Sequence, residues 1–331
     1  VMNKIHALQF PQAEVRKERK AVKYLYIDAD EDHVALQYIT QKGDIKKPRT
    51  NTVMPKLIYV YEGIKQENGR NELVNKKYFG GVYEGSEAVE QLWKEVAEYI
   101  EASYDTEKLV KIYINGDGAA WIKSGQKILY KAKFVLDRFH MHKYITGATS
   151  HLLDSAEDAR NEIYHAIHQK KKHQAEEVFE KILKVTESES KRKAVESAKA
   201  YILGNWAGIM QWVRDKNEEV KCSAEGHISH VFADRMSSRP LGWSKTGADK
   251  ISRLRVYERN GGSMLDLVRF QKANLPKAAG CEEVVYTSTQ MFMAERKRRE
   301  ALGMWADIPV YSIPYPQIRK IAALKGHIWG L

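Results

Sequence analysis

The sequence has 331 residues, with 54 Lys or Arg against 43 Asp or Glu, so its formal net charge is +11. A hydrophobic content of 43% is enough for a buried core, and no apolar run approaches the ~18 residues of a membrane helix. Two cysteines, Cys222 and Cys281, exclude a disulfide framework and a cysteine-rich zinc site, and residues 1–20 lack the apolar core of a signal peptide. We therefore expect a cytoplasmic protein, and the basic excess favours a polyanionic partner such as nucleic acid.

Residues 1–20 are polar and basic, and we expect a tail there. Residues 21–145 alternate between strand-like and helix-like segments. Runs of β-branched and aromatic residues predict strands at 23–30, 33–40, 56–64, 77–85, 108–116 and 132–137. We expect 33–40 to be the neighbour of 23–30. Helical spacing of apolar residues predicts helices over 86–104 and from 138 onward, so a mixed sheet with packed helices follows.

Residues 146–220 form an all-helical block in this interpretation, because they are rich in Lys, Glu and Ala and contain no Pro. We expect two or three long helices in the segments 159–187 and 191–215. Residues 221–265 return to the sheet region with a helix over 223–237, a loop over 238–250 and a basic helix ending at Gly261. No role is assigned to residues 266–331.

Two predicted strands end in isolated aspartates. Asp28 and Asp30 share one face of the first strand because side chains alternate, and the strand 108–116 leads directly to Asp117. A carboxylate at the end of a buried strand is costly unless it meets a cation. We expect Gly116 and Gly118 to let the chain turn sharply and to leave room for a bulky ligand.

The acids together favour a metal site, although Asp117 alone fits an ordinary turn. A third carboxylate, Glu225, lies on a predicted helix beyond the all-helical block. Two Asp and one Glu from two strands and a helix suit a pair of hard divalent cations. His227 and His230 near this helix also allow a zinc interpretation, which we consider the weaker one.

Four segments in order resemble the DDE-type transposases of bacterial insertion sequences and the related Mutator-like and hAT transposases. They read YIDADEDHVALQ, YINGDGAAWI, FVLDRFHMHKYI and AEGHISHVFADRMSSRPLGWS. The resemblance covers about residues 20–265. It implies a ribonuclease H-like fold, an α/β core whose mixed five-stranded sheet is flanked by helices and interrupted by an all-helical insertion.

The resemblance also implies roles for single residues. Asp30 matches the first catalytic acid, with Asp28 as the alternative, and Asp117 matches the second. Glu225 matches the third acid, and its rivals are Glu218, Glu219 and Glu258. These three acids would hold two Mg²⁺ or Mn²⁺ ions. Asp137 and His140 match a C/D-x-x-H signature and would support the site.

The function implied is metal-dependent cleavage of DNA at the ends of a mobile element, followed by strand transfer through in-line phosphodiester displacement. The partners would be the terminal inverted repeats of the element, target DNA and a second copy in a homodimer. We expect a nucleoid-associated protein that contacts no membrane. Basic and aromatic residues that would contact DNA are Arg138, Arg235, Arg239, Trp243, Lys245, Arg253 and Arg255.

Two alternatives stay open. One is a non-transposing nuclease of the same fold, and the other is a catalytically inactive DNA-binding protein derived from a transposon. Such transposases usually carry an N-terminal domain that reads the element ends. Nothing before residue 20 can be that domain, so we expect an N-terminal region to be missing from this sequence.

Overall fold

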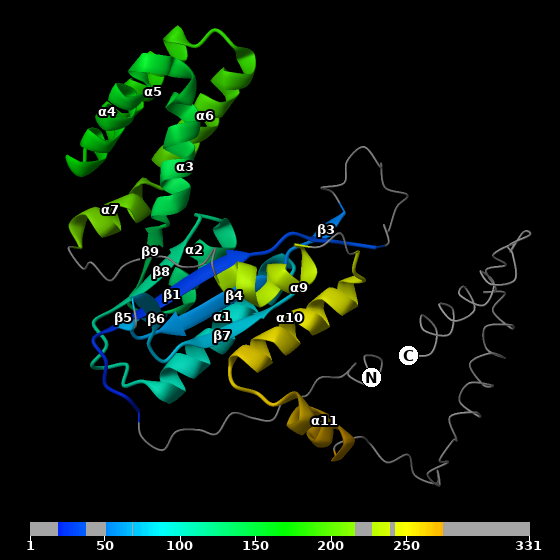
Figure 1. The fold of residues 1–331 in the computed structure, drawn as a ribbon. Helices are drawn as coiled ribbons and strands as arrows, with labels where there is room; N and C mark the ends of the chain where they lie inside the picture. Colours follow the sequence, from blue (N-terminus) through cyan, green and yellow to red (C-terminus); the bar gives the residue numbers. More distant parts are fainter. Residues whose placement is uncertain (1–18, 38–50, 68, 216–226, 239–241, 274–331) are drawn as a thin grey trace, which may run out of the picture. The chain divides into compact units, whose positions relative to one another are not determined.

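The structure is a computed structural model that describes residues 19–37, 51–67, 69–215, 227–238 and 242–273 (Figure 1). All of them belong to one structural unit, Val1–Asn274. The predicted third acid, its two upstream rivals and one predicted DNA-contacting arginine lie outside the described residues; they are Glu225, Glu218, Glu219 and Arg239. Within the described ranges, no helix is both long enough and apolar enough to span a membrane.

A five-stranded mixed sheet forms the centre of the described residues. Its strands, in spatial order, are β7 (Lys77–Gly81), β4 (Lys56–Tyr61), β1 (Tyr24–Glu31), β8 (Lys111–Gly116) and β9 (Ala132–Leu136). β4 runs antiparallel to β1 and β7, whereas β1, β8 and β9 are parallel to one another. The mixed sheet expected from the sequence is thus present, and its order is compatible with a ribonuclease H-like arrangement.

The expectation that residues 33–40 pair with the first strand is wrong. Only β2 (Val34–Ala35) is a strand there among the described residues, and it pairs with β3 (Thr52–Val53) in a separate two-stranded sheet. β1 instead pairs with β4 and β8. The turn-like residues after Asp30 carry the chain away from the sheet, and the backbone N–H of Asp32 donates to the carbonyl of Pro55 at 3.1 Å. β5 (Ile64–Glu67) and β6 (Arg70–Leu73) form a further hairpin.

The alternation of side chains along β1 separates two cores. Leu25, Ile27 and Ala29 face a cluster that includes residues of α1 (Gly85–Ser103) and α2 (Ala120–Ile128). The opposite face carries Tyr26 and a group of buried tyrosines from the neighbouring strands. It is covered by a π-helical turn (Ser229–Ala233), α9 (Asp234–Met236) and α10 (Lys245–Arg259), which lies against β7 (Figure 1).

The basic helix starts earlier than the sequence predicts. Ser244 is its N-cap, and the Ser244 hydroxyl accepts a hydrogen bond from the backbone N–H of Gly247 at 3.0 Å. The predicted loop therefore ends near residue 244 rather than 250. The helix ends at Arg259, before Gly261 with φ +85°. α11 (Met264–Ala273) follows.

Between β9 and residue 215 all regular elements are helices. The elements are α3 (Arg138–Thr149), a 3₁₀ turn (Ser150–Ser155), α4 (Ala156–His168), α5 (Lys172–Val185), α6 (Glu189–Gly204) and α7 (Trp206–Arg214). The expected two or three long helices are thus four, α4 to α7. Lys170 takes a left-handed φ of 61° between α4 and α5, and Asn205 leaves helical geometry between α6 and α7.

The last of these helices returns to the sheet. α7 packs on β9, and a Cβ added at Gly208 would come within 2.7 Å of the Phe134 ring. Only glycine permits this approach of the helix to the strand. The helical segment is therefore attached to the sheet at both of its ends, through α3 and through α7.

Candidate active site

Three aspartates follow one another at the carboxyl ends of the three parallel strands. Asp30 lies near the end of β1, Asp117 directly follows β8, and Asp137 directly follows β9. The register pairs Asp28 with Asn115, and Gly116 with Leu136. Carboxyl ends of parallel strands meet at one edge of a sheet, and the alternation of side chains places the three aspartates on one face. The sequence prediction that Asp30 and Asp117 come together is thus supported by the register.

The carboxylates of Asp30 and Asp117 interact unfavourably. Burial raises the pKa of Asp30 to about 6, and the negative charge of Asp117 adds to the rise. Glu31 N–H donates to Asp30 Oδ1 at 2.8 Å, and neither aspartate forms an ion pair with any residue that the structure describes. Two like charges held together in a partly desolvated place favour a cation between them.

The turn that carries Asp117 is held by local contacts. Asp117 Oδ1 accepts a hydrogen bond from the N–H of Ala119 at 2.9 Å, as in an Asx turn, and Gly118 has a φ of +94° that favours glycine. The expectation that the two flanking glycines leave room for a ligand is wrong. A Cβ at Gly116 would come within 2.7 Å of Ile122, and one at Gly118 within 2.6 Å of Asn205, so protein atoms fill both places.

Asp137 and His140 form a pair next to these acids. Asp137 is the N-cap of α3 and accepts hydrogen bonds from the backbone N–H groups of Phe139 and His140. His140 Nδ1 lies 2.7 Å from Asp137 Oδ2, and an ionised carboxylate only accepts, so Nδ1 carries the proton. The hydrogen bond to Asp137 raises the pKa of His140, and the charges of Asp117 and Asp30 raise it further.

Asp28, the alternative first acid, is enclosed by the sheet. Its side chain is completely buried and accepts hydrogen bonds from Tyr59 OH at 2.7 Å, Tyr61 OH at 3.2 Å and Asn115 Nδ2 at 2.7 Å. These donors stabilise a carboxylate inside the core. Asp30, at the open end of the same strand, is the better placed of the two for a ligand.

The donor set fits a hard cation only in part among the described residues, where no three His, Cys, Asp or Glu side chains are grouped to hold a metal ion. Asp30 and Asp117 supply the oxygen ligands that Mg²⁺ prefers. The two histidines of the zinc interpretation have other contacts. His227 lies 2.8 Å from Tyr78 OH, and burial lowers its pKa to about 4, whereas His230 is exposed and lies 3.3 Å from Asp234.

Three of the predicted DNA-contacting residues lie on the segment after the π-helical turn. Arg235 is exposed, and its guanidinium lies 5.5 Å from the centre of the Trp243 ring. The N–H of Trp243 donates to Ala35 O at 2.9 Å, which places Trp243 beside β2. Lys245 forms an exposed ion pair with Glu84. On α3, Arg138 is exposed and stacks 4.6 Å from the centre of the Trp212 ring.

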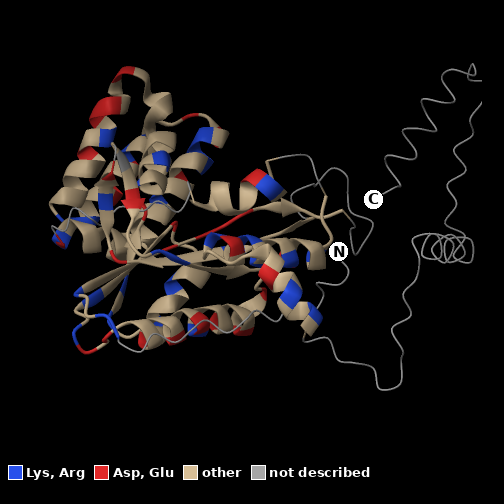
Figure 2. Cartoon of the chain, turned by 60° about the horizontal axis from the view of Figure 1, so that its bottom comes forward, with Lys and Arg blue, Asp and Glu red and all other residues tan. Residues whose placement is uncertain are grey.

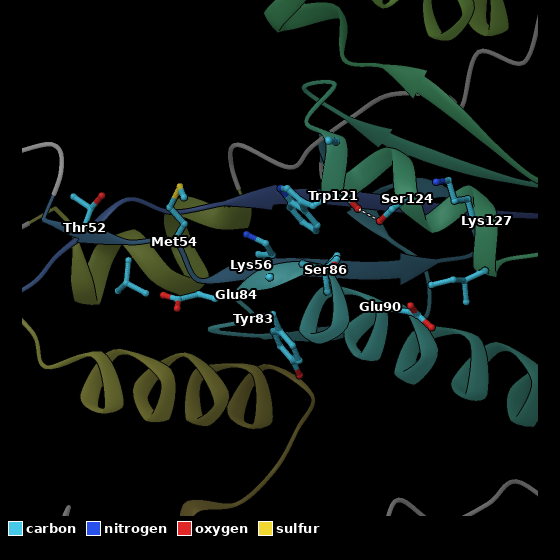
Figure 3. A pocket seen from close by; sticks show the side chains of 15 residues that line it. Thr52, Met54, Lys56, Tyr83, Glu84, Ser86, Glu90, Trp121, Ser124 and Lys127 are labelled. Carbon is cyan, nitrogen blue, oxygen red and sulfur yellow. Dashed lines mark hydrogen bonds between the residues drawn. The ribbon is translucent and has the colours of Figure 1, made fainter.

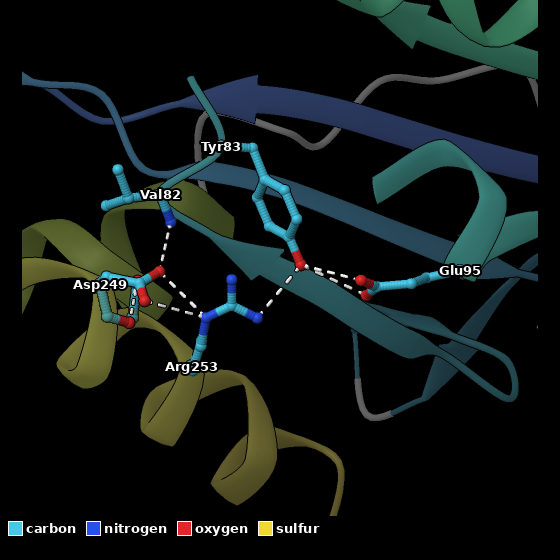
Figure 4. Close-up of polar contacts among 6 residues, drawn as sticks. Val82, Tyr83, Glu95, Asp249 and Arg253 are labelled. Carbon is cyan, nitrogen blue, oxygen red and sulfur yellow. Dashed lines mark hydrogen bonds and ion pairs between the residues drawn. The ribbon is translucent and has the colours of Figure 1, made fainter. Parts of the chain in front are cut away.

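Two arginines of α10 bind other parts of the protein. Figure 4 shows Arg253, whose Nε lies 3.0 Å from Asp249 Oδ1 and whose Nη1 donates to Tyr83 OH at 3.3 Å. Asp249 Oδ1 also accepts from Val82 N–H at 2.8 Å. Arg255 donates to the carbonyls of Val231 and His230 in the π-helical turn, at 3.0 and 2.9 Å. The sequence shows only the basic character of this helix, because the partners are distant along the chain.

A cavity of about 770 Å³ lies between the start of α1 and α2 (Figure 3). Lys56 in its wall is buried, pairs with Glu31 Oε2 at 3.0 Å and lies 5.0 Å from the centre of the Trp121 ring. Glu31 alternates with Asp30, so this cavity opens on the sheet face opposite to Asp30. No motif in the sequence indicated it.

Sequence reasoning also missed a tyrosine that reaches the site. The hydroxyl of Tyr201, on α6, donates to the backbone carbonyl of Asp117 at 2.5 Å, across 84 positions of sequence. Only the packing of the helical segment onto the sheet brings the two together.

Comparison with known proteins places these residues in a family. The sequence matches the Uncharacterised protein family (UPF0236) over residues 2–273. A UPF0236 protein of Caldanaerobacter subterraneus subsp. tengcongensis is 44% identical over 259 residues, which is 78% of this chain and 51% of the relative. Another from the same organism is 43% identical with the same coverage, and its name comprises eleven locus designations of that organism.

A more distant relative also carries the UPF0236 name. It is the UPF0236 protein in the vanSb 3′ region of Streptococcus gallolyticus, which is 24% identical over 76% of this chain and 52% of its own length. The chain spans about half the length of the curated relatives it matches. Because the family match covers most of the sequence, including every described element, the chain belongs to the UPF0236 family.

Proposed function

We propose that this chain contains the catalytic region of a DNA transposase, which cleaves DNA strands at the ends of a mobile element and joins them to target DNA. The observation that carries the proposal is the meeting of Asp30 and Asp117 at the ends of adjacent parallel strands, where the charge of Asp117 helps to raise the pKa of Asp30. Carboxylates kept together against their repulsion are a frequent sign of a functional site.

The arrangement around the two aspartates supports the proposal. The sheet order β7-β4-β1-β8-β9 and the helical insertion after β9 agree with what the resemblance to DDE-type transposases implies for a ribonuclease H-like core. The relative whose name comprises eleven loci of one organism supports a mobile element, because such elements multiply within a genome.

Asp30 and Asp117 would hold magnesium or manganese together with Glu225, the third acid in the resemblance. When bound, two such cations activate water or a DNA 3′-hydroxyl and neutralise charge on the leaving oxygen. The protein's own part is to fix the two carboxylates at the strand ends and to present His140. The raised pKa of His140 favours its protonated form, which can donate to a phosphate oxygen.

DNA is the proposed partner, in line with the formal net charge of +11. Lys and Arg are interspersed with Asp and Glu along the helices (Figure 2). DNA binding would therefore depend on individual basic side chains. Arg138, Arg235 and Lys245 are exposed and available for phosphate contacts. Recognition of terminal inverted repeats, a homodimer and association with the nucleoid belong to the same proposal for the whole protein.

A cleavage assay tests the proposal. Supercoiled plasmid that carries the flanking ends of the encoding element is incubated with the full-length protein and Mg²⁺ or Mn²⁺. We expect nicks at the ends and strand-transfer products with wild type, and neither with Asp30→Asn, Asp117→Asn or Glu225→Gln. Asp28→Asn separates the two candidates for the first acid.

The alternatives give different results when RNA–DNA hybrids and DNA junctions are tested beside the plasmid. Cleavage of hybrids or junctions without any strand transfer would show a non-transposing nuclease. DNA binding without cleavage by wild type would show an inactive derivative. Cleavage retained by Asp117→Asn would refute the proposed site.

A further inference from the structure

The end of helix α6 contacts the turn that presents Asp117 at two points. Tyr201 OH donates to Asp117 O at 2.5 Å. Asn205, one helical turn later, lies against Gly118, where an added Cβ would come within 2.6 Å of Asn205 Oδ1. Asn205 Nδ2 in turn donates to Tyr201 O at 2.9 Å, so the two residues support each other.

The Tyr201 ring is itself held in place. It stacks on Tyr144 of α3, with ring centres 3.8 Å apart and planes 13° from parallel. Tyr144 lies one turn after His140 on the same helix, and residues four apart share a helix face. α3 thus carries both the histidine of the candidate site and the ring that orients Tyr201.

The backbone at Asp117 needs such support. β8 ends at Gly116, so Asp117 lies beyond the last residue that pairs with β9. Its side chain is held by Ala119 N–H, and its carbonyl by Tyr201.

We propose that Tyr201 is a positioning residue through which the helical insertion sets the Asp117 carboxylate relative to Asp30. The inference rests on the proposed function. The phenol contacts the backbone of Asp117, so its effect on the reaction would pass through that residue. Its loss would let the peptide after Asp117 rotate, and a small displacement of a metal-holding carboxylate is costly for the rate.

Tyr201→Phe tests this directly, because phenylalanine keeps the stacked ring and removes only the donor. We expect kcat for plasmid nicking to fall about 10- to 100-fold and the Mn²⁺ concentration for half-maximal rate to rise several-fold. KM for DNA should stay within about twofold, because a residue that acts through the position of Asp117 alters the chemical step and not DNA binding. Tyr164→Phe is the matched control, since Tyr164 OH bonds His142 Nδ1 at 2.7 Å in the same insertion.

The control should cut at the wild-type rate. Wild-type kcat and an unchanged Mn²⁺ requirement in Tyr201→Phe would overturn the inference while leaving the proposed function intact. Failure of wild type to cut would instead refute the proposed function. Calorimetric titration with Mn²⁺ gives a second readout, in which Tyr201→Phe should bind several-fold more weakly than wild type and Tyr164→Phe should not.

A second variant covers the case in which Tyr201→Phe does not fold. Tyr144→Leu removes the ring that orients Tyr201 and leaves the hydroxyl in the protein. We expect a smaller fall in kcat in the same direction, about 3- to 10-fold, with circular dichroism used to verify folding. An unchanged kcat in folded Tyr144→Leu would contradict the inference.

Discussion

Charged side chains are arranged differently along helix α10 and at the carboxyl ends of the parallel strands. Along α10, Arg253 pairs with Asp249, Arg255 with Glu258, and Lys245 with Glu84. At the strand ends, Asp30 and Asp117 repel each other, and neither has an ion-pair partner among the described residues. Paired charges join parts of a fold, whereas like charges held together against repulsion are explained by a ligand that the protein binds.

The largest expected effect is on cleavage. Asp117→Asn should lower the rate of metal-dependent nicking by about 1000-fold or more, because a neutral amide is a poor ligand for a hard cation. Its free energy of unfolding without metal should not fall, since the repulsion with Asp30 is removed. The nicking rate and urea unfolding in EDTA measure the two quantities. A nicking rate within tenfold of wild type would contradict the view that the carboxylates at the strand ends, unlike the charges of α10, serve a ligand.

The pH dependence of stability comes next. The pKa of Asp30 is about 6 in the folded protein against 3.8 ordinarily, so between these values the folded state binds more protons than the unfolded state. Stability should therefore fall as the pH rises from about 4 to about 6. Asp30→Asn should be more stable than wild type at pH 7.5 by up to about 3 kcal/mol, since one pKa unit corresponds to about 1.4 kcal/mol.

This difference should shrink to well under 1 kcal/mol at about pH 4. Chemical unfolding across this range in EDTA measures it. Asp154→Asn, at an exposed position of the 3₁₀ turn, is the control and should track wild type at each pH. A constant difference between Asp30→Asn and wild type would show that the carboxylate is not destabilised by burial and by Asp117.

A smaller effect on stability is expected for α10, where the substitution should lower the free energy of unfolding. Arg253→Met should lower the free energy of unfolding by about 1–2 kcal/mol, because Asp249 loses its cation and Tyr83 OH loses a donor. Nicking per folded molecule should stay near wild type. Arg269→Met is the matched control, since Arg269 pairs with Asp266 in an exposed position. Equal stability of the two variants would contradict a structural role for Arg253.

The smallest effect concerns Lys245. Its ion pair with Glu84 is exposed, so Lys245→Ala should change the free energy of unfolding by less than about 0.5 kcal/mol. If the lysine contacts a DNA phosphate, the variant should bind more weakly, and the slope of log affinity against log salt should decrease by about one. Binding measured over a salt series would separate this lysine from Arg253, whose slope should not change.

Much of the fold and part of the candidate site follow from local patterns. The apolar runs of β1, β4, β8 and β9 predict strands because β-branched and aromatic side chains fit a pleated, buried surface. Alternation then places Asp28 and Asp30 on one face, and an aspartate after the last apolar residue marks the strand end. The sequence indicates helix termini less well, as the early start of α10 at Lys245 shows.

The pairing of β1 could not be predicted in the same way. Residues 33–40 have strand-like composition, yet β4 and β8 occupy both edges of β1. Which strands pair depends on how their apolar faces fit together and on how the elements are connected. A short sequence pattern contains neither kind of information. The space beside Gly116 and Gly118 could not be predicted either, because Ile122 and Asn205, which belong to other elements, fill it.

By itself, the sequence determined most strands of the central sheet and the helical character of the segment after it, which side chains of β1 share a face, and where carboxylates end the strands. The tertiary structure alone decided that Asp28 is enclosed by tyrosines, that Arg253 binds Asp249 and Tyr83, and that Tyr201 supports Asp117. The physical reason is distance along the chain. Backbone preference acts over a few residues, whereas these contacts join groups brought together by the burial of apolar surface between distant segments.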